Sequence, residues 1–152
     1  MKLRLATNAD ADALCGVLNP IIARGGTTAF QTEFTRERMT EHYVLRPTMI
    51  ACTVAEDESG VLGFQSLAWA GPEDDLPEGW GVIATFARLD SAGKGVGSAL
   101  FEETKRRARE AGVRTIDATI RSYNTGGLAY YAKMGFTDWK VTPEAVSKRF
   151  DL

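Results

Sequence analysis

The sequence has few of the residues on which several common functions depend. Of 152 residues, one is histidine (His42) and two are cysteine, Cys15 and Cys52, which lie far apart with no CxxC spacing. A lone histidine cannot build a multi-histidine metal site, and the lack of an obvious serine or cysteine motif argues against a catalytic triad. We therefore expect no metal, and two reduced thiols that pack as small apolar side chains.

An excess of charge and a long apolar run are also missing. The chain carries 18 basic and 20 acidic residues, which does not indicate a protein that binds nucleic acid or a membrane surface. The basic run from Lys105 to Arg109 is interleaved with Glu102, Glu103 and Glu110, which favours a solvated helix face. No apolar stretch reaches membrane-spanning length, and the polar N-terminus cannot form a secretory signal. These features predict a cytoplasmic protein with no nucleic-acid or membrane partner.

The length and the residue patterns predict one domain, residues 1–152, of the α/β (α+β) class. A helix-start signal at Thr7 leads into an apolar helical spacing that Pro20 interrupts and Gly25–Gly26 ends. Two β-rich runs joined by a hairpin-type turn at 57–60 are followed by a third strand. We expect a mixed, mostly antiparallel central sheet of six to seven strands with about four helices on its faces. The expected strands are 2–6, 49–56, 61–70, 81–89, 113–120, 135–139 and 146–152, and the expected helices are 7–24, 35–45, 95–111 and 124–134.

The stretch DSAGKGVGSAL places Gly93, Gly95 and Gly97 between an expected strand and an expected helix. The first turn of a helix has unpaired N–H groups and a partial positive charge, and glycines let anion oxygens approach the backbone. The pattern is not a P-loop, because GxxxxGK[ST] is absent, and it is not the GxGxxG of a dinucleotide-binding turn. Taken alone, it fits a phosphate-binding loop and a flexible turn about equally.

A second stretch, NTGGLAYYAKMGF, opens the next expected helix. Asn124 is suited to cap that helix, and Tyr130 and Tyr131 are adjacent residues that would point to different faces of it. Taken alone, this stretch is therefore explained better by capping and packing than by a binding role.

Together, the two stretches resemble the acetyl-CoA-binding half of the GNAT superfamily of N-acetyltransferases. The superfamily's Gln/Arg-x-x-Gly-x-Gly/Ala pattern falls on residues 92–97, with Ala92 in the Gln/Arg position. Its second pattern is matched by Asn124, Gly127, Tyr131, Lys133, Gly135 and Phe136, where Gly127 replaces the usual alanine. The motifs cover about residues 85–139, and the order of expected elements fits the whole chain.

This resemblance implies acetyl-CoA as the cosubstrate and assigns residues to it. The amides of Gly93, Lys94, Gly95, Val96, Gly97 and Ser98 would hold the pyrophosphate. The backbone of Ala87 and Leu89 would pair with the pantetheine arm, and Asn124 would hydrogen-bond the arm's amides. Tyr131 would contact the cofactor and act as general acid, since a phenol with a pKa of about 10 is protonated at neutral pH.

The acceptor site is implied less sharply, at about residues 22–40 and 71–80. TTAFQTEF resembles the same region of phosphinothricin-type acetyltransferases, making Phe30 and Glu33 candidate acceptor contacts, whereas that subgroup's strand glutamate would fall at Val82. The expected function is direct transfer of an acetyl group to the primary amine of a small molecule, such as an amino acid or an analogue. A non-catalytic acyl-CoA-binding or sensing module and a protein or peptide N-acetyltransferase remain as alternatives. A homodimer is suggested by the resemblance alone.

Overall fold

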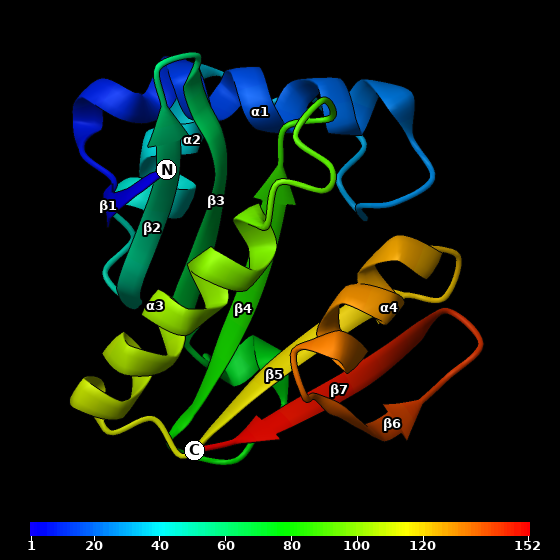
Figure 1. Ribbon diagram of the computed structural model, residues 1–152. Helices are drawn as coiled ribbons and strands as arrows, with labels where there is room; N and C mark the ends of the chain where they lie inside the picture. The colour runs from blue at the N-terminus through cyan, green and yellow to red at the C-terminus, as the bar shows by residue number, and fades with distance from the viewer.

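The computed structural model describes residues 1–152, and its seven strands form one open sheet (Figure 1). The sheet order is β1-β2-β3-β4-β5-β7-β6, and only the β4–β5 pair is parallel. The predicted mixed sheet is therefore confirmed. The strands are β1 (Lys2–Leu5), β2 (Met49–Asp57), β3 (Gly60–Trp69), β4 (Trp80–Ala87), β5 (Thr115–Arg121), β6 (Thr137–Val141) and β7 (Ala145–Asp151), and the helices are α1 (Ala11–Arg24), α2 (Arg36–Met39), α3 (Val96–Ala111) and α4 (Thr125–Lys133).

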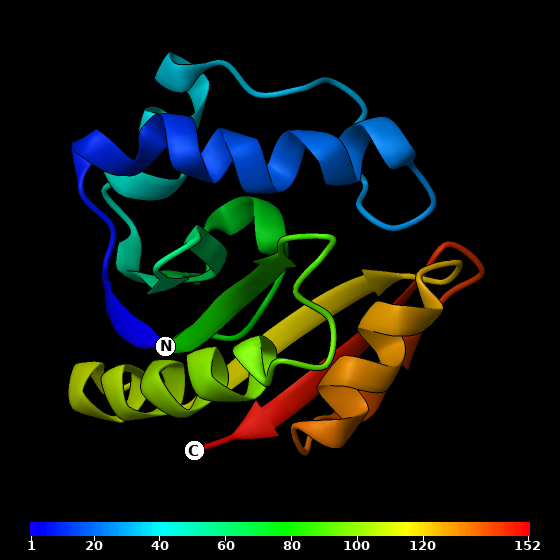
Figure 2. The same ribbon diagram turned by 45° about the horizontal axis from the view of Figure 1, so that its top comes forward.

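The helices lie in two layers on opposite faces of the sheet (Figure 2). On one face, α1 and α2 pack against strands β2 to β4 through a cluster that includes Leu14, Leu18, Met39, Phe64 and Phe86. On the other face, α3 and α4 pack against β2 to β5 through clusters that include Phe101, Leu100, Ile116, Ile120 and Tyr131. Because strand side chains alternate in direction, neighbouring residues of β4 belong to different layers.

Helix α1 continues through Pro20, as the expected helix 7–24 does, although this residue interrupts the apolar spacing. Proline removes the hydrogen bond to the carbonyl of residue 16, four positions earlier. Gly16 and Pro20 both lie on the exposed face of α1, so that carbonyl faces water and the helix loses little. The helix ends as predicted at Gly25, whose φ of +70° suits glycine.

Strands β4 and β5 pair only at their first residues and then separate. The paired positions are Trp80 to Val82 with Thr115 to Asp117, whereas β4 runs on to Ala87 and β5 to Arg121. The strands diverge in Figure 1, with β3 still paired along β4 and β7 along β5. The sheet is thus forked, and the fork leaves one side of β4 without a strand partner beyond Val82.

Basic residues of α3 form ion pairs with glutamates of the same helix. The basic run on α3 is a solvated face as predicted: Lys105 pairs with Glu102 at 2.7 Å and Arg107 with Glu103 at 3.0 Å.

Both cysteines are free, and no helix is long and apolar enough to cross a membrane.

Arg4 on β1 joins the start of α1 to the edge of the sheet. Its two Nη atoms each donate to a carboxylate oxygen of Asp10 at 2.8 Å, and its Nε donates to Glu56 at 2.9 Å. The guanidinium lowers the pKa of the Asp10 carboxyl below its ordinary value.

Candidate active site

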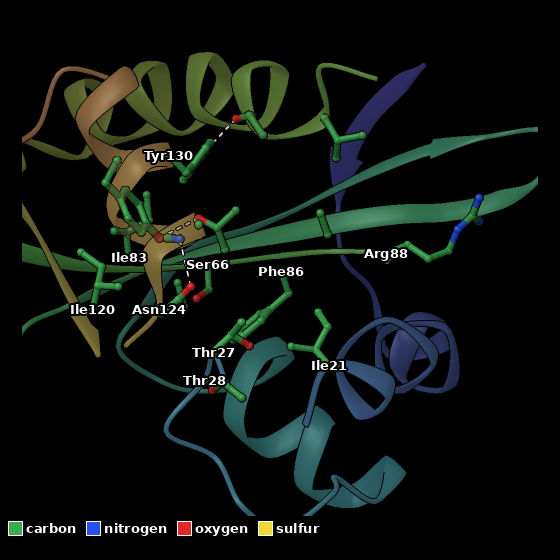
Figure 3. A pocket seen from close by; sticks show the side chains of 18 of the residues that line it. Ile21, Thr27, Thr28, Ser66, Ile83, Phe86, Arg88, Ile120, Asn124 and Tyr130 are labelled. Atoms are coloured by element: carbon green, nitrogen blue, oxygen red, sulfur yellow. Dashed lines mark hydrogen bonds between the residues drawn. The ribbon is translucent and has the colours of Figure 1, made fainter. Parts of the chain in front are cut away.

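A cleft of about 1060 Å³ opens where β4 and β5 separate. Its walls come from the segment after α1, from β4, from the loop before α3, and from α4. In the close view of Figure 3, Ile21, Thr27 and Thr28 enter from the α1 side, and Asn124 and Tyr130 enter from α4. The cleft therefore brings the two sequence motifs to one place.

The glycine-rich loop opens α3 with two residues that only glycine accommodates easily. Gly93 and Gly95 have φ angles of +80° and +74°, and a Cβ added to either would meet nothing within 4 Å. Gly95 is the N-cap of α3, a helix of 16 residues, and the loop and first turn line the cleft. The bare backbone and the unpaired N–H groups of the first helical turn suit a phosphate group.

At position 97 glycine is required by lack of space, not by the backbone conformation. A Cβ there would lie 2.5 Å from Cε1 of Tyr130, which is closer than side chains pack. The hydroxyl of Tyr130 donates to the carbonyl oxygen of Gly97 at 2.7 Å. The third glycine thus lets α4 approach α3, a contact between distant residues that the sequence pattern does not reveal.

Asn124 caps α4, accepting a hydrogen bond at Oδ1 from the backbone N–H of Gly127 at 3.0 Å. An alanine Cβ at position 127 would come within 2.6 Å of the Asn124 amide nitrogen. Asn124 also lines the cleft, and its cap uses only the oxygen. Its side-chain NH₂ group remains available for a ligand.

Tyr131 lines the cleft but is almost enclosed, with 7% of its surface exposed. Its hydroxyl lies 2.8 Å from Oγ1 of Thr85. Burial raises the pKa of Tyr131 well above its ordinary value, so the phenol is protonated throughout the neutral range. The neighbouring Tyr130 also lines the cleft, and burial raises its pKa to about 12. The two tyrosines therefore share one wall, whereas the sequence placed them on different faces.

The structure places most of the other predicted residues in this cleft. Ala87, Leu89, Val96, Ser98 and Phe30 line it, and the Phe30 ring packs edge-on against Phe34 at 4.9 Å between ring centres. Two predicted residues are not brought to it: Lys94 and Glu33 do not line the cleft, and both are exposed.

The charges of the cleft wall were missed by sequence reasoning. No aspartate or glutamate lines the cleft, whereas six basic residues do: Arg24, His42, Arg46, Arg88, Arg121 and Lys133. Arg24 and Arg121 form no ion pair, and Arg46 is 4.0 Å from Glu73. Apart from His42 and Arg46, which lie four residues apart, these residues come from separate segments, so no local pattern could have grouped them. Burial, followed by the charges of Arg46 and Arg38, lowers the pKa of His42 and keeps the imidazole neutral at pH 7.

A smaller cavity of about 320 Å³ lies beside the cleft and shares Val82, Ile83 and Thr119 with it. Asp117 on β5 is buried there and accepts hydrogen bonds from Trp139 Nε1 at 3.0 Å and Thr119 Oγ1 at 2.8 Å. Burial raises the pKa of the Asp117 carboxyl. The segment 71–80, which the resemblance placed near the acceptor, contributes Glu73, Asp74 and Asp75 to this cavity and no carboxylate to the cleft.

The model of the acetyltransferase (GNAT) family matches residues 20–136. The chain belongs to this family. It is accordingly an acetyl-CoA-dependent N-acetyltransferase, as the two motifs indicated. The acetyltransferase is 33% identical over 159 residues to YwnH of Bacillus subtilis (strain 168), provisionally named a phosphinothricin acetyltransferase, and the match covers 100% of this chain and 95% of YwnH.

Solved structures share the fold of this acetyltransferase. YncA from Salmonella typhimurium, solved with acetyl-CoA, superposes with a TM-score of 0.84 at 18% identity, covering 99% of this chain and 93% of YncA. A phosphinothricin acetyltransferase from Sinorhizobium meliloti, solved in complex with acetyl-CoA, gives 0.82 at 20% identity, covering 99% and 88% of the two chains. Nowhere in residues 1–152 do three or more metal-binding side chains gather.

Proposed function

We propose that this acetyltransferase acts on the primary amine of a small molecule that also carries a carboxylate, such as an amino acid or an analogue. The observation that carries the proposal is the charge of the cleft wall. Arg24 and Arg121 line it without ion-pair partners, and no carboxylate lines it. A guanidinium binds a carboxylate through paired N–H groups, whereas a polyamine or other polycation would be repelled here. YwnH and the Sinorhizobium protein are named for phosphinothricin, itself an amino-acid analogue.

For the cosubstrate, we propose the residues that the motifs indicated. The N–H groups at the start of α3, with Gly93 and Gly95 leaving the backbone open, hold the pyrophosphate. The free side of β4 near Ala87 and Leu89 pairs with the pantetheine arm, and the Asn124 amide donates to it. Acetyl-CoA supplies the thioester carbonyl that the amine attacks.

Tyr131 is the proposed catalytic residue. The amine nitrogen forms a bond to the acetyl carbon, the carbon–sulfur bond breaks, and its electron pair stays on sulfur. Tyr131 donates a hydrogen bond to that sulfur as charge develops, and the amine's proton leaves to water. Because burial raises the pKa of Tyr131, the phenol stabilises the thiolate mainly by hydrogen bonding rather than by full proton transfer.

The test is an acceptor screen that follows CoA release by wild type and Tyr131→Phe. Amino acids should turn over with lower KM than their amides, whose carboxylate charge is removed, and polyamines should react poorly. Tyr131→Phe should lower kcat about a hundredfold and change the Kd for acetyl-CoA less than about twofold. Equal KM values for amino acids and amides would refute the acceptor class.

Two outcomes would favour the alternatives. Tight acetyl-CoA binding without CoA release for any amine would indicate a non-catalytic acyl-CoA-binding module. Release with peptides but not with free amino acids would indicate a protein or peptide acetyltransferase. A homodimer is a separate proposal, tested by the mass of the protein in solution.

A further inference from the structure

A chain of hydrogen bonds runs beneath the cleft and ends at the Tyr131 hydroxyl. Its first member is Gln65 on β3, which is fully buried. The Gln65 amide nitrogen lies 2.9 Å from Thr85 Oγ1 and 3.0 Å from the Tyr130 hydroxyl. Thr85 Oγ1 in turn lies 2.8 Å from the Tyr131 hydroxyl. Two strands and one helix therefore meet in one buried polar network.

Counting hydrogens fixes the direction of the first link. The Tyr130 hydroxyl has one hydrogen, and it donates this hydrogen to the carbonyl oxygen of Gly97 at 2.7 Å. It can therefore only accept from Gln65, which requires the NH₂ side of the amide to face it. The same NH₂ group has a second hydrogen, and this one points to Thr85 Oγ1. Gln65 Oε1 is then left on the other side, where it has no partner.

The last link can run in either direction. Thr85 Oγ1 accepts from Gln65 and lies 2.8 Å from the Tyr131 oxygen, and either of these two hydroxyls can be the donor. When Thr85 donates, the Tyr131 oxygen accepts, and no group of the protein takes the Tyr131 hydrogen. Tyr131 lines the cleft, so that hydrogen is then free for a ligand.

We propose that Gln65 and Thr85 are positioning residues that orient the Tyr131 hydroxyl as a hydrogen-bond donor into the cleft. The relay runs from the Gln65 N–H through the Thr85 O–H to the Tyr131 O–H, and each donation polarises the next group. If the network ran in the opposite direction, Tyr131 would spend its hydrogen on Thr85 and have none for the departing sulfur. This inference rests on the proposed role of Tyr131 and adds what makes that role available.

The burial of the relay is consistent with this role. Thr85 donates to the oxygen that gains negative charge when Tyr131 gives up its proton, which lowers the pKa of Tyr131 against the larger effect of burial. Gln65, unlike a lysine or an acid, can donate in this position without a charge that burial would penalise.

The experiment compares Thr85→Val, which removes the hydroxyl at nearly constant shape, with Thr85→Ser, which keeps it. Thr85→Val should lower kcat about tenfold while leaving the Kd for acetyl-CoA within about twofold, and Thr85→Ser should recover most of the rate. Gln65→Leu, which removes the donating N–H at similar size, should also lower kcat. Melting temperatures identify any variant that fails to fold.

The deciding readout is the double variant. If Thr85 acts through Tyr131, Thr85→Val should cost no further kcat in a Tyr131→Phe background. Multiplying effects in the double variant, or wild-type kcat in Thr85→Val, would overturn the relay. Wild-type kcat in Tyr131→Phe would instead overturn the proposed acid, so the two failures are distinguishable.

Discussion

Replacing Gly97 with alanine tests how the two ligand-binding segments are held together. The added Cβ would stand 2.5 Å from Tyr130 Cε1, so the ring must shift by about 1 Å to reach normal contact. Moving the ring strains the hydrogen bonds of its hydroxyl to Gly97 and Gln65. Overpacking and weakened hydrogen bonds should together cost about 2–4 kcal/mol.

Alanine also favours the helix by about 1 kcal/mol relative to glycine. The net loss in the free energy of unfolding should therefore be about 1–3 kcal/mol, which lowers the melting temperature by about 2–12 °C for a chain of this size. Urea unfolding and thermal melts measure both quantities.

Gly16→Ala is the matched control, because Gly16 lies on the exposed face of α1 and a Cβ there meets nothing within 4 Å. It should stabilise the protein by about 0.5–1 kcal/mol. In a Tyr130→Ala background the obstacle is gone, so Gly97→Ala should cease to be destabilising. Equal effects of Gly97→Ala in both backgrounds would refute the close-approach explanation.

Three further predictions follow from the charges. Ala92→Arg should tighten acetyl-CoA binding about twofold to fivefold at low salt, and titration calorimetry that shows no gain would count against a phosphate site at this loop. Because Arg4 lowers the folded-state pKa of Asp10, the Arg4–Asp10 pair stabilises the folded protein above the carboxyl's ordinary pKa, and this contribution is lost as pH falls through the lower folded-state value. Asp10→Asn should therefore make stability fall less steeply with decreasing pH. An unchanged fall in stability at acid pH would contradict this. Since burial raises the pKa of Asp117, which accepts from the Trp139 indole, the emission of Trp139 in a variant without the other two tryptophans should titrate with a midpoint above 3.8.

Local patterns were enough to predict the fold, because most elements carry their own start and stop signals. The apolar spacing and Gly25 define α1, and the run from Thr115 to Arg121 is a strand flanked by two helices. The reason that α1 tolerates Pro20 could not be predicted, since the exposure of that helix face is a property of the packed molecule.

The site was predictable only where its residues are neighbours in the sequence. Gly93, Gly95 and Asn124 lie in motifs and reach the cleft. Gln65 lies on a strand with no motif, and its meeting with Thr85 and Tyr130 depends on how β3, β4 and α4 pack. Such contacts between distant residues leave no periodic signal.

The absence of carboxylates from the cleft has a consequence for which amino groups react. His42, the one imidazole there, has a lowered pKa and holds a proton weakly, so an amine must arrive largely in its neutral form. At pH 7 the terminal α-amino group of a peptide, with a pKa of about 8, is neutral in roughly one molecule in ten, whereas a lysine ε-amino group with a pKa of about 10.4 is neutral in roughly one in 2,500. The difference is more than two hundredfold before any contact with the protein. Selection between α- and ε-amines is thus set in part by proton equilibria in the surrounding water.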